Sequence, residues 1–419
     1  MGHKRLYLVT HAFPYLNSET FLESELPWLV NRFKVVVVPS VVSGEPRDMP
    51  EGVEVDHRLA ERFSRPGRKL KATFRPSTWQ AVLRDAGRHH FRLSGVRRSV
   101  SFMADAWAAA DWHQTLSSES AIYYSYWLNG KTWGLINAVR EHANQYVVAR
   151  THRFDLYDDW FDPPFWPLRQ QTLADIDALF VISQDGLRWL QHRYETHSAI
   201  GVSRLGVCDP QLQSCRSTDG VLRICSVSSL LPQKRVACLA ELLVRYCADF
   251  PDRQVAWQHF GDGPLRGEVE SVLRTAKADN LSASMPGVVS NPEVLAWYRD
   301  NPVDLFVNVS DSEGIPVSIM EAQSCGIPAM ATNVGGVSEI VNDENGFLIE
   351  EQLDYSVMKA ILHRVAGGES PSPETIRAGF LRQYHADHNY AEFAGFLDQV
   401  SNGQCPAWSE ASNGQSDAT

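Results

Sequence analysis

Short runs of apolar residues alternate with longer amphipathic stretches along the first half of the chain. The runs are rich in Val, Ile, Leu and Tyr, and they lie at residues 5–10, 34–40, 121–127, 145–151 and 177–183. Between such runs, residues 20–30 and 186–194 have apolar positions at helical spacing. Near-continuous apolar runs of this length favour strands buried on both faces. Strands that alternate with helices predict a parallel sheet covered by helices on both sides.

A polar, turn-prone segment at residues 206–220 interrupts this alternation, and the pattern then starts again. Strands are predicted at residues 222–228, 254–260, 303–310 and 327–333, and helices at 236–250 and 292–300. We therefore predict an α/β protein with two Rossmann-like domains, for which 419 residues are sufficient. The predicted parts are an N-terminal domain at 1–206, a linker at 207–220, a C-terminal domain at 221–373, terminal helices at 374–400 and a polar, disordered tail at 401–419.

Charge is distributed unevenly along the chain. The net charge of −11 argues against a nucleic-acid-binding protein. Residues 58–98, however, hold twelve Lys or Arg and only two acids, a local net charge of +10. Apolar side chains are interleaved with these cations, namely Phe63, Phe74, Trp79, Leu83 and Phe91. This segment predicts contact with phosphates or with anionic lipid, and a solvated basic loop is the alternative.

The remaining composition indicates a reduced, cytoplasmic protein. Seven cysteines are scattered along the chain without a C-x-x-C spacing, which is typical of free thiols and not of a disulfide framework or a zinc site. The apolar run near the N-terminus is short and predicts a strand, not a signal peptide. No run of 18 apolar residues is present that would predict a membrane span.

The stretch from Ser310 to Pro328 holds two acids, Glu313 and Glu321, separated by seven residues. It predicts a strand, then a loop that carries Glu313, then a helix with Pro316 in its first turn and Glu321 further along. A helix N-terminus favours an anion such as phosphate. Acids beside such a site accept hydrogen bonds from sugar or ribose hydroxyls. An ordinary solvated helix with a capping acid would show the same spacing.

Two other loops follow predicted strands in the second half. Lys234 and Arg235 lie at the start of a predicted helix, where two cations can clamp a diphosphate, although two solvated bases would fit as well. Gly261 and Gly263 follow the strand at 254–260 and predict a tight turn that lets the backbone approach a nucleotide. Their spacing matches a dinucleotide fingerprint only weakly.

His152 and Asp155 come directly after the strand at 145–151. A histidine at the carboxyl end of a strand, followed by an acid, can serve an active site, and a structural histidine fits the same position. The Gly-Lys-Thr at 130–132 lacks the glycine that a P-loop needs five positions before Gly130. The first strand leads into no G-x-G-x-x-G, which argues against a Rossmann dehydrogenase, and we find no metal-binding motif.

Together these stretches resemble glycosyltransferase family 4, a group of GT-B enzymes. The family signature of Glu, seven residues and Glu is matched by Glu313 and Glu321, and the similarity continues without a gap through residue 349. Further similar stretches lie at 203–207, 231–236, 261–264 and 286–298, in the family's order. The opening residues 13–26 look like the branch that builds bacterial capsular, exopolysaccharide and lipopolysaccharide chains.

The resemblance implies a GT-B fold with two domains that face a central cleft and a C-terminal helix that returns to the first domain. It implies that Glu313 contacts the transferred sugar, Glu321 the ribose hydroxyls and Lys234 the donor diphosphate, and that His152 faces the reacting centre. Many members have Gly-Arg where this chain has Ser228-Ser229, and Arg235 is a candidate replacement for that arginine. The remaining donor-binding residues that the resemblance implies are Ser229, Gly261, Gly263, Val288, Gly314 and Ile315.

The resemblance thus predicts a retaining, metal-independent glycosyltransferase without a cofactor, acting at a front face and without a covalent nucleophile. Its donor would be a UDP or GDP sugar, and its acceptor a hydroxyl of a saccharide or a lipid-linked saccharide bound by the N-terminal domain. The basic segment would contact the inner face of the cell membrane. Two rival functions remain at this stage, a non-catalytic GT-B-like protein that binds nucleotide sugars and an NAD-dependent oxidoreductase.

Overall fold

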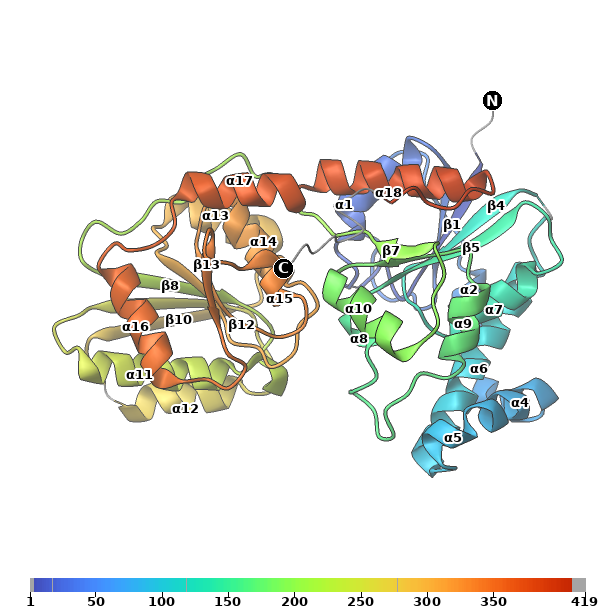
Figure 1. Cartoon of the computed structure of the whole chain (residues 1–419), viewed down its shortest axis with the longest axis horizontal. Helices are drawn as coiled ribbons and strands as arrows, with labels where there is room; N and C mark the ends of the chain where they lie inside the picture. The colour runs from blue at the N-terminus through green and yellow to red at the C-terminus, as the bar shows by residue number, and fades with distance from the viewer. Residues whose placement is uncertain (1–3, 17, 118, 277, 409–419) are drawn as a thin grey trace. The chain divides into compact units, whose positions relative to one another are not determined.

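The computed structural model describes residues 4–16, 18–117, 119–276 and 278–408, and it divides into two compact units (Figure 1). Unit 1 consists of Met1–Leu205 and Asp387–Thr419, and unit 2 of Gly206–Ala386. Each unit is built around one parallel sheet with helices on both faces, as the alternation of apolar runs predicts. Among the described helices, none is both long and apolar enough to cross a lipid bilayer.

Unit 1 contains a seven-stranded parallel sheet with the strand order β3-β2-β1-β4-β5-β6-β7. Its direction of winding reverses between β1 and β4, which makes this pair the topological switch point. The two shortest strands, β3 and β7, were not predicted from the apolar runs. The strands are β1 (Arg5–Thr10), β2 (Lys34–Pro39), β3 (Glu54–Val55), β4 (Ala121–Ser125), β5 (Gln145–Thr151), β6 (Ala178–Val181) and β7 (Ile200–Val202).

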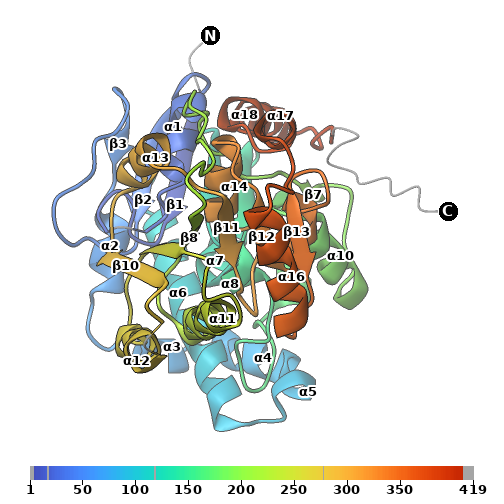
Figure 2. The same ribbon diagram turned by 90° about the vertical axis from the view of Figure 1, so that its left-hand side faces the viewer.

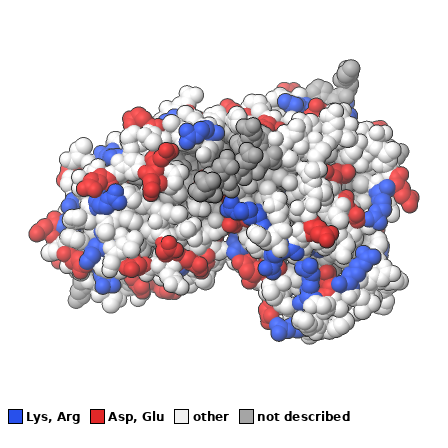
Figure 3. All heavy atoms as spheres, viewed as in Figure 1, with Lys and Arg blue, Asp and Glu red and all other residues white. Residues whose placement is uncertain are grey.

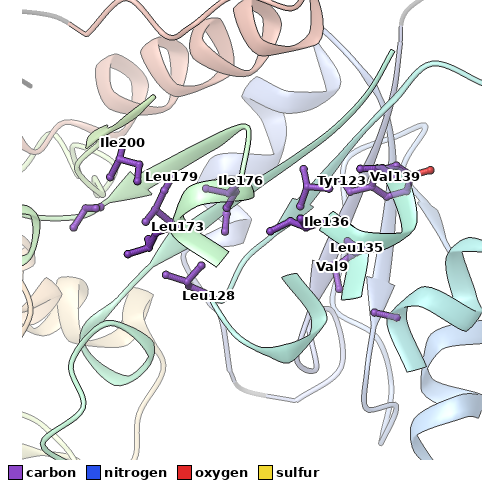
Figure 4. Packing of buried hydrophobic residues seen from close by; sticks show 14 of the residues in the cluster. Val9, Tyr123, Leu128, Leu135, Ile136, Val139, Leu173, Ile176, Leu179 and Ile200 are labelled. Carbon is purple, nitrogen blue, oxygen red and sulfur yellow. The ribbon is translucent and has the colours of Figure 1, made fainter. Parts of the chain in front are cut away.

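Helices cover both faces of this sheet. One face packs against α1 (Leu22–Val30) and α18 (Ala386–Ser401). The other packs against a second set of helices, shown in part in Figure 4. These are α2 (Arg58–Phe63), α6 (Leu93–His113), α7 (Gly130–Val139), α9 (Arg169–Asp175) and α10 (Gln184–Arg193).

Alternate side chains of β1 belong to two different hydrophobic cores, one on each face of the sheet. Tyr7 and Val9 belong to the cluster that includes α6 and α7, whereas Leu6 and Leu8 belong to the cluster that includes α1 and α18. Successive side chains of a strand point to opposite faces, so a central strand buried on both sides has apolar residues at consecutive positions.

A fully buried ion pair lies on the α1 and α18 side of the sheet. Arg150 of β5 and Glu25 of α1 are 3.5 Å apart, and both side chains are 0% exposed. The Arg150 guanidinium also donates to the Tyr124 hydroxyl at 3.1 Å and lies 4.1 Å from the centre of the Phe393 ring on α18. This cluster joins the sheet to both helices of that face.

The basic segment at residues 58–98 folds into short helices that lead into α6. They comprise α2, α3 (Arg68–Thr73), α4 (Pro76–Arg84) and α5 (Ala86–His89), and Figures 1 and 2 both show α4 and α5 at one end of unit 1. In Figure 3, Lys and Arg side chains gather over this end. The helices are only one or two turns long, so their apolar positions do not establish a helical period in the sequence.

Unit 2 contains a six-stranded parallel sheet with the order β10-β9-β8-β11-β12-β13, and its switch point lies between β8 and β11. The strands are β8 (Leu222–Val227), β9 (Val255–Phe260), β10 (Leu281–Gly287), β11 (Leu305–Asn308), β12 (Ala329–Thr332) and β13 (Gly346–Ile349). The helices are the 3₁₀ turn η1 (Pro232–Lys234), α11 (Val236–Asp249), α12 (Arg266–Ala276), α13 (Asn291–Asp300), α14 (Val317–Ser324), α15 (Val337–Ile340), α16 (Tyr355–Ala366) and α17 (Pro373–Gln383).

The chain after α18 differs from the disordered tail predicted from residue 401 onwards. Trp408 packs against Phe180 and Phe396, and its indole nitrogen donates to the Ser198 carbonyl at 2.8 Å. Burial of one large aromatic ring holds this otherwise polar segment on unit 1. The rest of the predicted tail, residues 409–419, lies outside the described residues.

We predict that Glu25→Ala lowers the free energy of unfolding by about 3–5 kcal/mol, because it leaves the Arg150 charge buried without its partner. Glu23→Ala is the matched control on the same helix, since Glu23 pairs with Arg47 at the surface, and it should cost no more than about 1 kcal/mol. Urea unfolding followed by circular dichroism measures both. Equal losses in the two variants would show that the buried pair contributes nothing specific.

Candidate active site

The loops after β8 and β11 meet at the switch point of unit 2. The loop after β8 ends in η1 and brings Lys234 to this edge, and the loop after β11 carries Glu313. The Lys234 ammonium donates to a Glu313 carboxylate oxygen at 2.6 Å. A backbone hydrogen bond of 2.9 Å from Asp311 to Gln233 joins the same two loops. The structure thus brings together two residues that lie 79 positions apart.

Glu313 is held in place by the end of β11, which precedes it, and by the loop after β12. Asn308, the last residue of β11, donates from its side-chain amide to Glu313 at 3.3 Å, and its side-chain oxygen accepts from the Ser310 backbone at 3.0 Å. Gly335 has φ +53°, and a Cβ there would lie 2.0 Å from the Glu313 carbonyl oxygen. A side chain at position 335 would therefore displace the Glu313 loop.

Glu321 lies on α14 and accepts a hydrogen bond from the side-chain amide of Asn291, the first residue of α13. Burial raises the pKa of the Glu321 carboxyl to about 7, and the bond from Asn291 opposes this shift. A carboxyl with this pKa is divided between its acid and its carboxylate near neutral pH. The charge of the Glu321 side chain therefore depends on pH in the physiological range.

Arg235 has a different environment from Lys234. Its guanidinium donates to the carbonyl oxygens of Val309, Glu351 and Ser310 at 2.6, 2.8 and 2.9 Å. In this structure Arg235 holds the loop after β11 through these three carbonyl oxygens. Its contact with a donor phosphate stays a prediction.

The glycine turn after β9 contacts a protein loop at close range. Gly261 has φ +135°, and a Cβ there would lie 1.8 Å from the Ser228 carbonyl oxygen, while a Cβ at Gly263 would lie 2.6 Å from the Leu230 carbonyl oxygen. Both glycines therefore let the backbone pack against the loop that precedes Lys234. Ser229, in that loop, is exposed.

The last three predicted donor-binding residues lie at the same edge of the sheet. Val288 directly follows β10 and its side chain is 76% exposed. Gly314 and Ile315 are buried in the loop before α14, which begins at Val317. Pro316 is the N-cap of this helix and not part of its first turn, so Gly314 and Ile315 precede the helix. Their contact with a phosphate stays a prediction.

His152 follows β5 at the corresponding edge of unit 1. Its ring packs against the rings of Tyr126 and Trp127, each 4.7 Å away between centres, and these two rings also contact one another. Neither ring nitrogen has a hydrogen-bond partner within the described part of the chain. Burial and then the nearby Arg150 lower the pKa of His152 to about 3. The imidazole is therefore neutral at pH 7, and both of its ring nitrogens are buried.

Asp155 does not orient the His152 ring, since the nearest oxygen lies 3.9 Å from the ring nitrogen Nδ1. Its carboxylate instead accepts from the backbone of His152 and of Leu128, both at 2.6 Å. Burial raises the pKa of Asp155 to about 6, and these backbone bonds oppose the shift. Asp155 thus fixes the loops after β4 and β5 to one another.

Glu19 was not predicted as a functional residue, yet it organises the same edge. Its carboxylate accepts from the backbone amides of His11, Ala12 and Phe13 at 2.7–2.9 Å and from the Trp127 indole at 2.6 Å. Through Trp127 it fixes one face of the His152 environment. A buried acid in a polar loop has no periodic pattern, and only its position after the first strand hints at this role.

Lys131, set aside as part of a failed P-loop match, is buried at the start of α7. Its ammonium donates to the Thr10 carbonyl and the Ser40 hydroxyl, both at 2.8 Å, and so joins the ends of β1 and β2. Burial lowers the pKa of Lys131 to about 8. These two hydrogen bonds account for the buried position of the Lys131 ammonium without a phosphate ligand.

Comparisons with known proteins agree with this architecture. Residues 222–367 match the family described as glycosyl transferases group 1. The putative colanic acid biosynthesis glycosyltransferase WcaL of Salmonella typhimurium is 29% identical over 81% of this chain and 85% of its own length. The match to WcaL of Escherichia coli is also 29% identical and spans 45% of this chain and about half of that protein, 47%.

Solved structures of low identity share the fold. The lipopolysaccharide outer core galactosyltransferase WaaB superposes with a TM-score of 0.66 and 16% identity, over 94% of this chain and 99% of that one. Anabaena HepE in complex with UDP and glucose superposes with a TM-score of 0.62 and 15% identity, over 94% and 100% of the two chains. The chain therefore has the GT-B fold, and its residues 222–367 form a domain that matches the glycosyl transferases group 1 family.

Proposed function

We propose that the enzyme transfers a sugar, with retention of configuration, from a nucleoside-diphosphate donor to a hydroxyl of a saccharide or lipid-linked saccharide during synthesis of a bacterial surface polysaccharide. The observation that carries the proposal is the Lys234–Glu313 pair at the switch point of unit 2, with Glu321 on the helix that follows. The names of the WcaL relatives and the UDP and glucose bound to HepE support the pathway and the donor class.

Each of these residues suits one part of such a donor. Breaking the bond between the anomeric carbon and the phosphate oxygen leaves negative charge on the departing diphosphate, and the Lys234 ammonium stabilises it. A diphosphate competes with Glu313 for this ammonium and so frees the carboxylate to accept a sugar hydroxyl. Glu321 accepts from the ribose hydroxyls. We propose that Lys234 provides the charge that a divalent ion supplies in metal-dependent transferases.

His152 contributes a neutral hydrogen-bonding group in this proposal. Because its pKa is lowered to about 3, it adds no positive charge beside an oxocarbenium-like transition state. Its two ring nitrogens can donate to and accept from a sugar hydroxyl. We assign no covalent nucleophile, and the proposed reaction takes place at one face of the sugar. Hydrolysis or transfer from a panel of UDP and GDP sugars, combined with thermal stabilisation by each donor, tests the function as a whole.

The basic segment is the part of unit 1 that we propose contacts an anionic membrane. Its helices expose large apolar side chains, of which Leu70 is 63% and Phe74 79% exposed. Trp79, Leu83 and Phe91 are exposed as well. Phe63 differs from the prediction, since it is only partly exposed and the Arg68 guanidinium covers its ring at 4.2 Å. Exposed apolar side chains among cations suit the surface of a bilayer with anionic lipid.

We predict that Lys234→Ala weakens donor binding, whereas Glu313→Ala acts mainly on turnover. Lys234 would hold a diphosphate in the ground state, and Glu313 would touch the sugar as its charge changes. Either loss should cost about 2–4 kcal/mol. Initial rates over a range of donor concentrations, in excess EDTA, separate the two effects. Lys359→Ala is the control, because it removes an exposed pair with Asp249 elsewhere in unit 2. Wild-type turnover by Glu313→Ala at saturating donor would disprove its role.

We predict that donor affinity falls as the pH drops below about 7, where the Glu321 carboxylate gains a proton. A protonated carboxyl accepts fewer hydrogen bonds from the ribose hydroxyls. Glu321→Gln should bind donor weakly and without this pH dependence, and Glu350→Gln, a change at an exposed acid, should keep it. Calorimetric titration with UDP between pH 5.5 and 8.5, roughly the range over which such a group titrates, measures the effect. An unchanged pH profile in Glu321→Gln would assign the titration to another group.

We predict that Leu70→Ser/Phe74→Ser reduces binding to anionic vesicles by about tenfold or more. In the unsubstituted chain the two apolar side chains would move from water into the bilayer, and the serine variant loses this favourable transfer. The control is Val357→Ser/Leu381→Ser, which changes exposed apolar residues of unit 2. Co-sedimentation with phosphatidylcholine vesicles, with and without phosphatidylglycerol, measures binding. Equal sedimentation with both vesicle types, or with neither at low salt, would contradict membrane contact.

A further inference from the structure

A cavity of about 260 Å³ lies among α2, α3 and α6 of unit 1. Its lining has an unusual balance of charge, with five cations and one carboxylate. These are Arg62, Arg65, Arg68, Lys71, Arg75 and Asp111. Cations that converge on one concave surface repel each other, and an anion bound among them removes this repulsion.

Helix α6 supplies the opposite wall of the cavity. Ala104, Trp107, Ala108 and Asp111 line it, and their spacing of three and four residues places them on one face of the helix. The two alanines leave room beneath the cationic side chains. Trp107 presents its ring to Arg75, whose guanidinium lies 4.1 Å from the ring centre. One wall of the space is therefore a regular helix, and Arg75 is held against it by the Trp107 ring.

The protein's own carboxylates compensate only part of this charge. Arg68 pairs with Asp105, and Arg75 lies 3.4 Å from Asp111. For Arg62, Arg65 and Lys71, no carboxylate lies within 4.0 Å in the described ranges of the chain. Three cations of the cavity are thus left for a bound anion.

The cavity adjoins the ligand-binding edge of the unit 1 sheet. Gly130, at the start of α7 after β4, packs so closely on α6 that a Cβ would lie 2.3 Å from the Phe102 carbonyl oxygen and 3.0 Å from the Asp105 Cβ. The Phe63 ring has the Arg68 guanidinium 4.2 Å from its centre and the Lys131 ammonium 5.9 Å away. Lys131 lies at the ends of β1 and β2, next to the switch point, where parallel sheets bind ligands.

We propose that this cavity binds a phosphate or diphosphate group of the acceptor. The inference rests on the proposed transferase function, in which the donor phosphates bind at Lys234 in unit 2, so that a second anion site in unit 1 serves the other substrate. Arginine forks pair with two phosphate oxygens at once, and Lys71 adds a point charge. An acceptor attached through a phosphate ester, and not a free neutral sugar, is the substrate that this charge recognises.

Inorganic pyrophosphate is the probe, titrated calorimetrically into the full-length Lys234→Ala chain so that the donor site does not contribute. The test variant adds Arg65→Ser/Lys71→Ser, two residues without an ion-pair partner among those described. Its matched control adds Lys69→Ser/Arg97→Ser, exposed cations of α3 and α6 that do not line the cavity. We expect binding that weakens with salt and falls about tenfold or more in the test variant only.

The outcomes separate a phosphate site from a lipid surface. Absence of pyrophosphate binding, or equal losses in the test and control variants, would overturn the proposal. A third outcome would also overturn it: pyrophosphate binds neither chain, and the test variant loses binding to vesicles that contain phosphatidic acid. The cations would then bind a bilayer surface and not a phosphate group in the cavity. Donor hydrolysis by the unsubstituted chain is measured separately. If it fails, the proposed transferase function fails, while the pyrophosphate result still decides whether the cavity binds an anion.

Discussion

The constraint on which the rest of the molecule depends is the adjacency of β8 and β11 in the sheet of unit 2. Every strand of a parallel sheet ends at the same edge, and at this one pair the connections leave in opposite directions. The loops that follow the two strands therefore share the space between them, and Lys234 and Glu313 meet there at 2.6 Å. Another strand order would place these residues at distant points of the same edge.

Around this pair, individual side chains hold loops that have no regular backbone hydrogen bonding. Asn308 holds Glu313, and Arg235 holds the loop after β11 through three carbonyl oxygens. Glu19 and Asp155 do the same for the loops of unit 1, where each accepts several backbone N–H groups. Loops carry backbone groups without helix or strand partners, so a buried loop needs such side chains to satisfy them.

Burial also determines the charge state of the candidate site residues. It raises the pKa of Glu321 to about 7 and lowers that of His152 to about 3, so the first titrates near neutrality and the second stays uncharged. The two units thus differ in electrostatic character, with a paired and titrating site at the switch point of unit 2 and an excess of cations beside the sheet edge of unit 1.

The sequence by itself determined the α/β class, the two parallel sheets and most of their long strands, because a strand buried on both faces is mostly apolar, as β1 and β2 are at their central positions. It also singled out Glu313, Glu321, Lys234 and His152 as candidate site residues, since acids, cations and a histidine after apolar runs stand out in the chain. Only the tertiary structure decided what each residue touches. It paired Lys234 with Glu313 and assigned Arg235 to backbone carbonyls. It brought Lys131 to the ends of β1 and β2, and it assembled a cavity from the cations of the short helices. These contacts join residues far apart in the chain through non-periodic loops, so neither spacing nor apolar periodicity records them.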